Sequence, residues 1–276
     1  MALQDAGGAA DTASAQPFVR IDDVDLVYGQ GDSDIKALSA ASIDVEKGGF
    51  AAVVGPSGCG KSSLMKLTTG LIRPTRGSVT VDGAEVTGPV SIAGMAFQNP
   101  TMLPWRTTLQ NVMLPLEVVQ PHRKRLRANK DEYVARAEGL LEAVGLGGFG
   151  ARSPWELSGG MQQRASLCRA LIHEPELLML DEPFGALDAF TREELWAVLQ
   201  KLWMERRFTV ILVTHDLREA VYLADTIHIM SARPGRVVAK QKVPLAFPRT
   251  LEDTFKPEFV DIVHDLRDHI SRERQV

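Results

Sequence analysis

The sequence predicts an α/β fold built on a mostly parallel β-sheet. Three short apolar runs, at residues 50–54, 177–180 and 209–213, have the composition of strands that are buried on both faces. Segments with helical spacing separate these runs, and strands that alternate with helices pair most simply as parallel neighbours. Helices on both faces of the sheet would then cover the apolar strands.

The other elements follow from local patterns along the chain. Residues 18–28 are expected to form the first strand, because Val24, Leu26 and Tyr28 would share one face. Further strands are expected at 40–45, 78–81, 92–97 and 227–230. Helices are expected at 62–71, 109–119, 131–144, 159–172, 191–205, 217–223 and 258–270, the last with one amphipathic stripe.

A change of character marks residues 100–156, where prolines interrupt the helical spacing. We interpret this stretch as a helical subdomain inserted into the α/β core. The first 16 residues are too polar to bury anything, which predicts a flexible tail. The chain therefore divides into a tail at 1–16, a main domain at 17–245 and a C-terminal helical extension at 246–276.

Composition excludes several classes of protein. The 276 residues carry a formal net charge of -4, so no overall positive field recruits nucleic acid, and we expect no nucleic-acid partner. The chain has 2 cysteines, too few for a disulfide framework, which favours a reduced, cytosolic setting. No stretch approaches the roughly 18 consecutive apolar residues of a membrane-spanning helix.

A glycine-rich loop follows the apolar run at 50–54. It fits the pattern G-x-x-x-x-G-K-[ST], which predicts a site for a nucleoside triphosphate with Mg²⁺; the simpler alternative is a turn that merely joins strand to helix. Glycines let backbone N–H groups point at one centre, and the next helix directs its positive end at the phosphates. Lys61 would reach the β- and γ-phosphates, and the Ser62 hydroxyl would bind Mg²⁺. The predicted loop consists of Gly55, Pro56, Ser57, Gly58, Cys59, Gly60, Lys61, Ser62 and Ser63.

Two acids end the apolar run at 177–180. At the end of that strand, Asp181 would lie beside the Mg²⁺ of the phosphate site. Glu182, one residue later, would face the γ-phosphate, where a carboxylate can orient the attacking water or accept its proton. The alternative is an ordinary solvated pair of acids between a strand and a loop.

Ser158, Gly159 and Gly160 stand at the start of the helix expected at 159–172. Taken alone, they are a helix N-cap with flexible glycines, or a second anion-binding helix start. Together with the phosphate loop, however, the segment 157–164 (Leu-Ser-Gly-Gly-Met-Gln-Gln-Arg) resembles the signature motif of the ATP-binding-cassette ATPases. Met161 stands where that family commonly has Gln. The resemblance extends over about residues 19–230.

This resemblance implies a P-loop NTPase cassette: a mostly parallel core, an antiparallel β subdomain, an inserted α-helical subdomain, and ATP with Mg²⁺. Tyr28 would stack on adenine, and Gln98 would touch Mg²⁺ and the attacking water. Asp188 would lie at the seam of a dimer, and His215 would contact the γ-phosphate. The catalytic residues would be Glu182, His215 and Gln98; the metal-binding residues would be Ser62, Gln98 and Asp181. Alone, Tyr28 could be a core aromatic, Gln98 a surface side chain and His215 a structural histidine.

The resemblance also implies how the protein assembles. Two copies would pair head to tail, so that each ATP lies between the phosphate loop of one copy and Ser158, Gly159 and Gly160 of the other. The dimer would dock on separate permease subunits at the cytoplasmic face of the inner membrane. The docking segment would be 99–106, with Met102, Leu103 and Trp105 exposed; the alternative is that these side chains pack internally.

Further segments resemble the importers of nitrate, sulfonate and taurine: 104–106 (Pro-Trp-Arg), 184–192 and 232–236 (Ala-Arg-Pro-Gly-Arg). A periplasmic or lipoprotein solute-binding protein would then belong to the same system. An exporter ATPase, a soluble cassette ATPase without a transport role, and a phosphate-loop kinase or GTPase are the alternatives. A soluble cassette ATPase is disfavoured because the chain has neither paired cassettes nor coiled-coil insertions. A GTPase is disfavoured because the chain lacks a base-recognition motif of the Asn-Lys-x-Asp type. A kinase or GTPase would also not need the segment 157–164 or His215.

Two secondary signals complete the pattern. Cys59 lies beside Lys61 at a helix N-terminus, a setting that can lower the pKa of a thiol. We therefore expect a reactive Cys59 whose oxidation impairs ATP binding. The basic run at 122–127 is expected to be a solvated loop, with a lipid or nucleic-acid contact as the alternative.

Overall fold

The computed structural model describes residues 16–29 and 34–273, and its larger sheet has the strand order β10-β9-β3-β8-β7-β6. All neighbouring strands pair in parallel except β10 and β9. The bounds are β3 (Phe50–Val54), β6 (Ala93–Ala96), β7 (Leu177–Asp181), β8 (Thr209–Val213), β9 (Thr226–Met230) and β10 (Val237–Lys242). Every residue of β3, β7 and β8 is buried, which confirms the predicted core of parallel strands.

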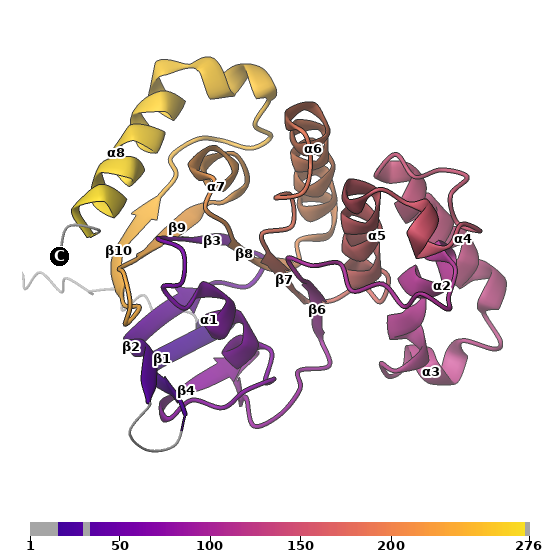
Figure 1. Ribbon diagram of the computed structural model, residues 1–276, viewed down its shortest axis with the longest axis horizontal. Helices are drawn as coiled ribbons and strands as arrows, with labels where there is room; N and C mark the ends of the chain where they lie inside the picture. The colour runs from indigo at the N-terminus through magenta and orange to yellow at the C-terminus, as the bar shows by residue number, and fades with distance from the viewer. Residues whose placement is uncertain (1–15, 30–33, 274–276) are drawn as a thin grey trace, which may run out of the picture.

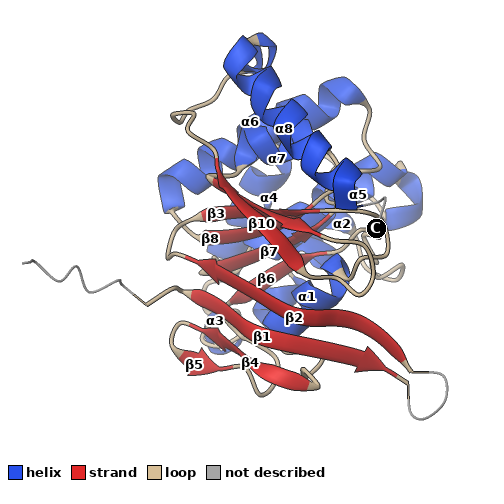
Figure 2. Ribbon diagram, turned by 90° about the vertical axis from the view of Figure 1, so that its left-hand side faces the viewer, coloured by secondary structure: helices blue, strands red, loops and turns tan. Residues whose placement is uncertain are grey.

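Alternate residues of β3 face two different layers. Phe50, Ala52 and Val54 pack with the helices on one face, and the rings of Phe50 and Trp203 meet edge to face with centroids 5.6 Å apart. Ala51 and Val53 face a smaller sheet and the first helix. Figures 1 and 2 show the two sides of the sheet. The helices are α1 (Lys61–Thr68) on the side of the smaller sheet, and α5 (Gly159–Leu171), α6 (Ala189–Arg206), α7 (Leu217–Leu223) and α8 (Pro257–Glu273) on the other.

The smaller sheet is antiparallel and has the order β2-β1-β4-β5. Its strands are β1 (Val19–Tyr28), β2 (Ile35–Val45), β4 (Arg76–Val81) and β5 (Ala84–Glu85). The implied antiparallel subdomain is thus present. The second strand begins five residues earlier than expected at 40–45, because the residues from Ile35 onward pair with the end of β1 near Tyr28.

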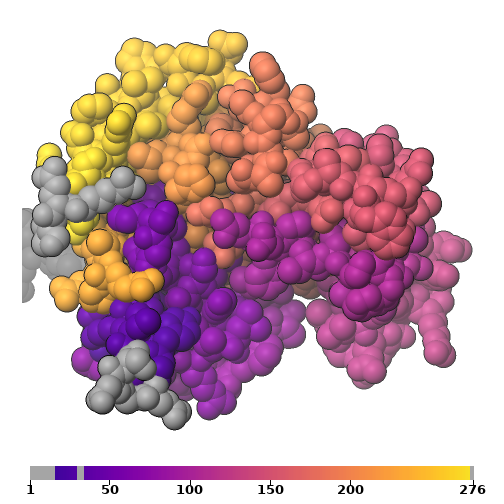
Figure 3. Space-filling model, in the orientation of Figure 1, coloured from indigo at the N-terminus to yellow at the C-terminus, as the bar shows by residue number. Residues whose placement is uncertain are grey.

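Residues 100–156 form a lobe beside the core, to the right in Figures 1 and 3. The lobe contains α2 (Thr108–Val112), the 3₁₀ helix η1 (Leu114–Glu117), α3 (His122–Arg125), α4 (Lys130–Ala143) and the 3₁₀ helix η2 (Pro154–Glu156). The single helix expected at 109–119 is wrong, because Pro115 cannot donate to an α-helical turn and lies in the first turn of η1 instead. The basic run is also not a plain loop: α3 occupies most of it, and His122 bonds Tyr133 in α4.

The C-terminal segment contains the 3₁₀ helix η3 (Leu251–Phe255) before α8, and one buried side chain ties it to the core. The Arg249 guanidinium donates to the carbonyl oxygens of Val221 and Ala224 at the end of α7 and to that of Leu245. Burial lowers the pKa of Arg249 to about 10. The tail expected at 1–16 falls, except for residue 16, outside the described residues.

One glycine controls how closely α5 approaches the edge strand β6. A Cβ at Gly94 would lie 2.1 Å from the carbonyl oxygen of Ala170 in α5. Gly94→Ala is therefore expected to lower the free energy of unfolding by about 1–3 kcal/mol, measured by urea denaturation. Gly139→Ala is the matched control: Gly139 lies inside α4, where an added Cβ would meet nothing within 4 Å, so the change should add roughly 0.5–1 kcal/mol. Equal effects would contradict the close approach.

Candidate active site

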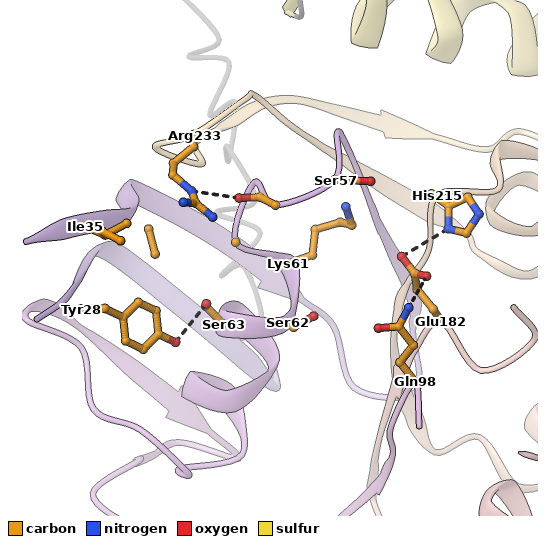
Figure 4. A pocket seen from close by; sticks show the side chains of 13 residues that line it. Tyr28, Ile35, Ser57, Lys61, Ser62, Ser63, Gln98, Glu182, His215 and Arg233 are labelled. Carbon is orange, nitrogen blue, oxygen red and sulfur yellow. Dashed lines mark hydrogen bonds and ion pairs between the residues drawn. The ribbon is translucent and has the colours of Figure 1, made fainter. Parts of the chain in front are cut away.

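A pocket of about 640 Å³ lies where the strands β3, β6, β7 and β8 end. Figure 4 shows it with Lys61 near its centre, Tyr28 at one end, and Glu182 with His215 at the other. Most of the predicted nucleotide and catalytic residues are therefore in one place. The pocket is lined by Tyr28, Ile35, Ala37, Ser57, Gly58, Gly60, Lys61, Ser62, Ser63, Gln98, Glu182, His215 and Arg233.

The floor of the pocket is the loop between β3 and α1. Gly58 and Gly60 have φ angles of 75° and 101°, which residues with a side chain rarely adopt. A Cβ at Gly55 would lie 2.8 Å from the carbonyl oxygen of Met230. The helix α1 begins at Lys61 without an acid in its first turn, so its positive end faces the pocket uncompensated. The predicted strand, loop and helix are all present.

The Lys61 ammonium group lies within the loop itself. Its Nζ donates to the carbonyl oxygens of Gly55 and Pro56, each at 2.9 Å. The side chain is buried even though it is charged, and these two carbonyls compensate for the lost water. A cation is thus held at the centre of the phosphate loop.

The expectation of a reactive Cys59 is wrong. Its side chain is 1% exposed, and Sγ lies 3.8 Å from Lys61 Nζ. Burial raises the pKa of the Cys59 thiol, and it outweighs the opposing effect of the Lys61 charge. The sequence indicated a reactive thiol because Cys59 lies at a helix N-terminus. That location does not indicate whether the sulfur faces the pocket or the core.

Asp181 and Ser62 lie together at the end of β7. Burial raises the pKa of the Asp181 carboxyl, and the nearby Ser62 hydroxyl opposes that shift. No group of three or more His, Cys, Asp or Glu side chains suited to a metal ion occurs among the described residues.

Two residues from neighbouring strand ends contact the Glu182 carboxylate, Gln98 by a hydrogen bond and His215 as an ion-pair neighbour. Gln98 Nε2, just beyond β6, lies 3.2 Å from its Oε2. His215 Nδ1, just beyond β8, lies 3.2 Å from its Oε1. The three residues predicted to be catalytic thus meet at one carboxylate, which faces the pocket from the side opposite Tyr28 (Figure 4).

A second layer of polar residues supports the His215 segment, and sequence reasoning missed it. The Thr214 hydroxyl bonds the fully buried Glu219 at 3.2 Å and accepts the backbone N–H of Asp216 at 3.0 Å. Arg192 of α6 pairs with Asp216 at 3.2 Å. Burial raises the pKa of Glu219 well above its usual range. The only sequence signal was Asp216, which caps α7.

The signature residues Ser158, Gly159 and Gly160 do not line this pocket, and neither does Asp188. Ser158 caps α5 and accepts the backbone N–H of Met161 at 3.3 Å. Asp188 caps α6 and accepts the N–H of Thr191 at 3.0 Å, which lowers the pKa of its carboxyl. Within one chain these residues form helix starts outside the nucleotide pocket.

The segment 99–106 exposes one of the three apolar side chains expected there. Trp105 is 75% exposed, whereas Met102 and Leu103 are half-buried. Buried Asn111 exchanges hydrogen bonds with the Leu103 backbone and fixes the loop from below. Met102 and Leu103 are therefore partly packed inside the protein, as the alternative interpretation expected, whereas Trp105 is not. No described helix is long and apolar enough to cross a membrane.

The family model for "ABC transporter" matches residues 38–185, more than half of the chain. The chain belongs to the ABC transporter family. This cassette is therefore an ATP-binding subunit with ATPase activity. The match spans the phosphate loop, Gln98, the signature segment and the two acids that end β7, so the resemblance stated from those motifs is confirmed.

Relatives and solved structures agree with this family. The cassette is 45% identical to the aliphatic sulfonates import ATP-binding protein SsuB of Bacillus licheniformis over 223 residues, 81% of this chain and 84% of that protein. It is 39% identical to the ABC transporter ATP-binding protein MJ0412 of Methanocaldococcus jannaschii, over 91% and 92% of the two chains. The dimeric ATP-binding cassette MJ0796 bound to ADP and Pi superposes with a TM-score of 0.71 and 30% identity, covering 83% of this chain and all of that one.

The burial of both thiols gives a direct prediction. Burial raises the pKa of Cys168 to about 12 and that of Cys59 in the same direction, so neither thiolate should form in the folded protein near neutral pH. We expect no fast reaction with a thiol-titrating disulfide reagent near neutral pH, and release of both thiols on unfolding in guanidinium. One thiol per chain that reacts quickly in the folded protein, and is lost in Cys59→Ala, would contradict the buried position of Cys59.

Proposed function

We propose that this cassette hydrolyses ATP to drive a separate membrane permease that imports a small anionic solute. The observation that carries the proposal is the convergence of Gln98, Glu182 and His215 at the end of the pocket that holds Lys61. A phosphate-binding loop alone serves many enzymes. The carboxylate with two polar neighbours at the distal end is what suits hydrolysis by water.

ATP would lie along the pocket with its adenine at Tyr28. The Tyr28 ring is 40% exposed, which argues against a core aromatic, and its hydroxyl is 3.0 Å from Ser63 Oγ. This contact holds the ring at the rim, where it can stack on a base. The backbone N–H groups of the loop 55–63 would bind the phosphates, and Lys61 would exchange its carbonyl partners for phosphate oxygens.

Mg²⁺ fits the oxygen donors at the base of the pocket. Asp181 is a buried carboxyl near the Ser62 hydroxyl, and both groups are the hard oxygen ligands that Mg²⁺ prefers. Burial disfavours the Asp181 charge, and a bound cation would restore it. Ser62, Asp181 and Gln98 would hold the ion, which neutralises charge on the phosphates when bound.

Glu182 would orient and deprotonate the attacking water. Its backbone has a positive φ of 46° and its N–H bonds the Val213 carbonyl at 2.8 Å, so the side chain leaves the sheet in a fixed direction. His215 and Gln98 hold the two carboxylate oxygens and would contact the γ-phosphate side of the substrate. Catalysis then depends on positioning and electrostatics, without a covalent intermediate.

The site would be completed by a second copy of the cassette. Ser158, Gly159 and Gly160 stand at the exposed start of α5, a helix of 13 residues, and lie outside the pocket of their own chain. The MJ0796 cassettes that resemble this chain were solved as dimers. In a head-to-tail pair, each signature segment would cover the nucleotide of the partner, with Asp188 at the seam.

The transport role rests on relatives and on one exposed surface. The SsuB proteins of several Bacillus species are named as importers of aliphatic sulfonates. By that similarity, we infer that the solute is an aliphatic sulfonate, and the segments 104–106, 184–192 and 232–236 add taurine and nitrate as candidates. A periplasmic or lipoprotein solute-binding protein would deliver it. The cassette would work at the cytoplasmic face of the inner membrane. Trp105 would contact the permease. An exporter is the second candidate, since the direction of transport depends on the permease.

Substitution of Glu182 tests the hydrolytic site. Glu182→Gln keeps the shape of the side chain but cannot accept a proton, so ATP turnover should fall about a hundredfold or more while ATP binding is retained. Sedimentation of this variant with saturating Mg-ATP should reveal a stable dimer.

Lys61→Ala is the contrasting variant, because it should lose ATP binding itself and remain monomeric. Glu182→Gln protein that stays monomeric with bound ATP would argue against the head-to-tail site. Normal turnover in Glu182→Gln would remove the assigned role of the carboxylate.

The docking surface is tested by Trp105→Ala. Because Trp105 is exposed and does not line the pocket, the isolated variant should hydrolyse ATP normally yet co-purify poorly with the permease subunit produced in the same cells. Phe255→Ala is a matched control, since Phe255 is 73% exposed before α8. Equal retention of the permease by both variants would place the contact elsewhere.

A further inference from the structure

The turn between β9 and β10 brings an arginine to the rim of the nucleotide pocket. Arg233 lines the pocket together with Tyr28 and the loop residues, although it is far from them in sequence. Its Nε donates to the carbonyl oxygen of Gly58 at 3.2 Å. A Cβ at Gly58 would lie 3.6 Å from Arg233 Nη2, so the guanidinium group rests against the bare face of that glycine.

The turn holds its own shape. Ser231 N–H donates to the Arg236 carbonyl at 2.9 Å, and Arg236 N–H donates to Ser231 Oγ at 3.0 Å. The Ser231 hydroxyl also contacts the carbonyl of Pro234 at 3.3 Å. These bonds close the turn around Arg233 and restrict the position of its backbone.

The same turn is fixed against the phosphate loop. Gly235 N–H donates to the Ala37 carbonyl at 2.9 Å, and the Gly235 carbonyl accepts Ser39 N–H at 3.0 Å. A Cβ at Gly235 would lie 1.9 Å from the carbonyl oxygen of Cys59. The turn, β2 and the loop are therefore in direct contact. This contact fixes the backbone of Arg233 relative to Gly58, so their proximity does not depend on the flexibility of the arginine side chain.

The Arg233 guanidinium group has N–H donors that the bond to Gly58 does not use. Arginine offers five N–H donors, and in the described part of the chain the bond to Gly58 uses one of them. Figure 4 shows the side chain above the loop, on the side of Ile35 and Tyr28 and away from Glu182 and His215. It therefore faces the half of the pocket nearer the adenine site, whereas Lys61 serves the centre.

We propose that Arg233 binds the nucleotide, pairing its free guanidinium N–H groups with oxygens of the α- or β-phosphate. This assignment rests on the proposed orientation of ATP, with adenine at Tyr28. A planar guanidinium group is suited to two phosphate oxygens at once, and its fixed charge, together with that of Lys61, complements an anion in the pocket. Arg233 would thus extend the phosphate-binding surface from Gly58 toward Tyr28.

Nucleotide titration of matched variants tests the proposal. Arg233→Ala should weaken binding of ADP and ATP about tenfold or more, because a charge-assisted bond is lost, and Arg233→Lys should recover part of it. Adenosine, which has no phosphate, should bind all forms equally. Arg236→Ala is the control: Arg236 lies in the same turn and is exposed, but it does not line the pocket.

The outcomes separate this inference from the proposed function. A wild-type cassette that binds neither ADP nor ATP would defeat both. Normal nucleotide affinity in Arg233→Ala, with wild-type protein binding well, would overturn only the role of Arg233, as would an equal loss in Arg236→Ala or an equal loss of adenosine binding. Thermal unfolding without nucleotide should match wild type for both variants, and Arg233→Lys provides the comparison if Arg233→Ala unfolds early.

Discussion

The site depends on the register of three buried parallel strands, β3, β8 and β7, whose carboxyl ends lie side by side. Val53 of β3 pairs with Val213 of β8, and Val213 pairs with Asp181 of β7. Two further backbone bonds continue this register beyond the strands, from Glu182 N–H to the Val213 carbonyl and from Thr214 N–H to the Val53 carbonyl. The phosphate loop, the carboxylates and the histidine segment therefore leave the sheet side by side. A slip of one residue would turn every strand side chain to the opposite face and separate them.

The sequence predicted what depends on local pattern. The apolar runs predicted the parallel core, and the spacing of Gly55, Gly60 and Lys61 predicted the loop, because each depends on residues that are adjacent in the chain. What it missed depends on contacts between distant segments. The beginning of β2 is a strand because it pairs with β1, and Arg249 is buried because carbonyls at the end of α7 accept its bonds. No local pattern contains either fact.

The site shows the same division between local and distant information. Motifs placed Lys61, Gln98, Glu182 and His215 in one pocket. They gave the wrong chemistry for Cys59, because proximity to Lys61 in sequence does not show that the thiol is buried in the apolar cluster with the smaller sheet. Arg233 was visible only as part of an Ala-Arg-Pro-Gly-Arg segment. Its place at the pocket follows from Gly235, whose missing side chain lets the turn lie against the phosphate loop.

A continuous set of contacts links the hydrolytic site to the two surfaces proposed for partners. Glu182 bonds Gln98, which begins the segment that carries Trp105. Arg169 of α5 donates to the carbonyl oxygens of Pro100 and Thr101 in that segment. The signature residue Ser158 caps the N-terminus of the same helix. In the proposed assembly, α5 would therefore connect the docking segment, which it contacts through Arg169, with the signature residues that would face the second copy.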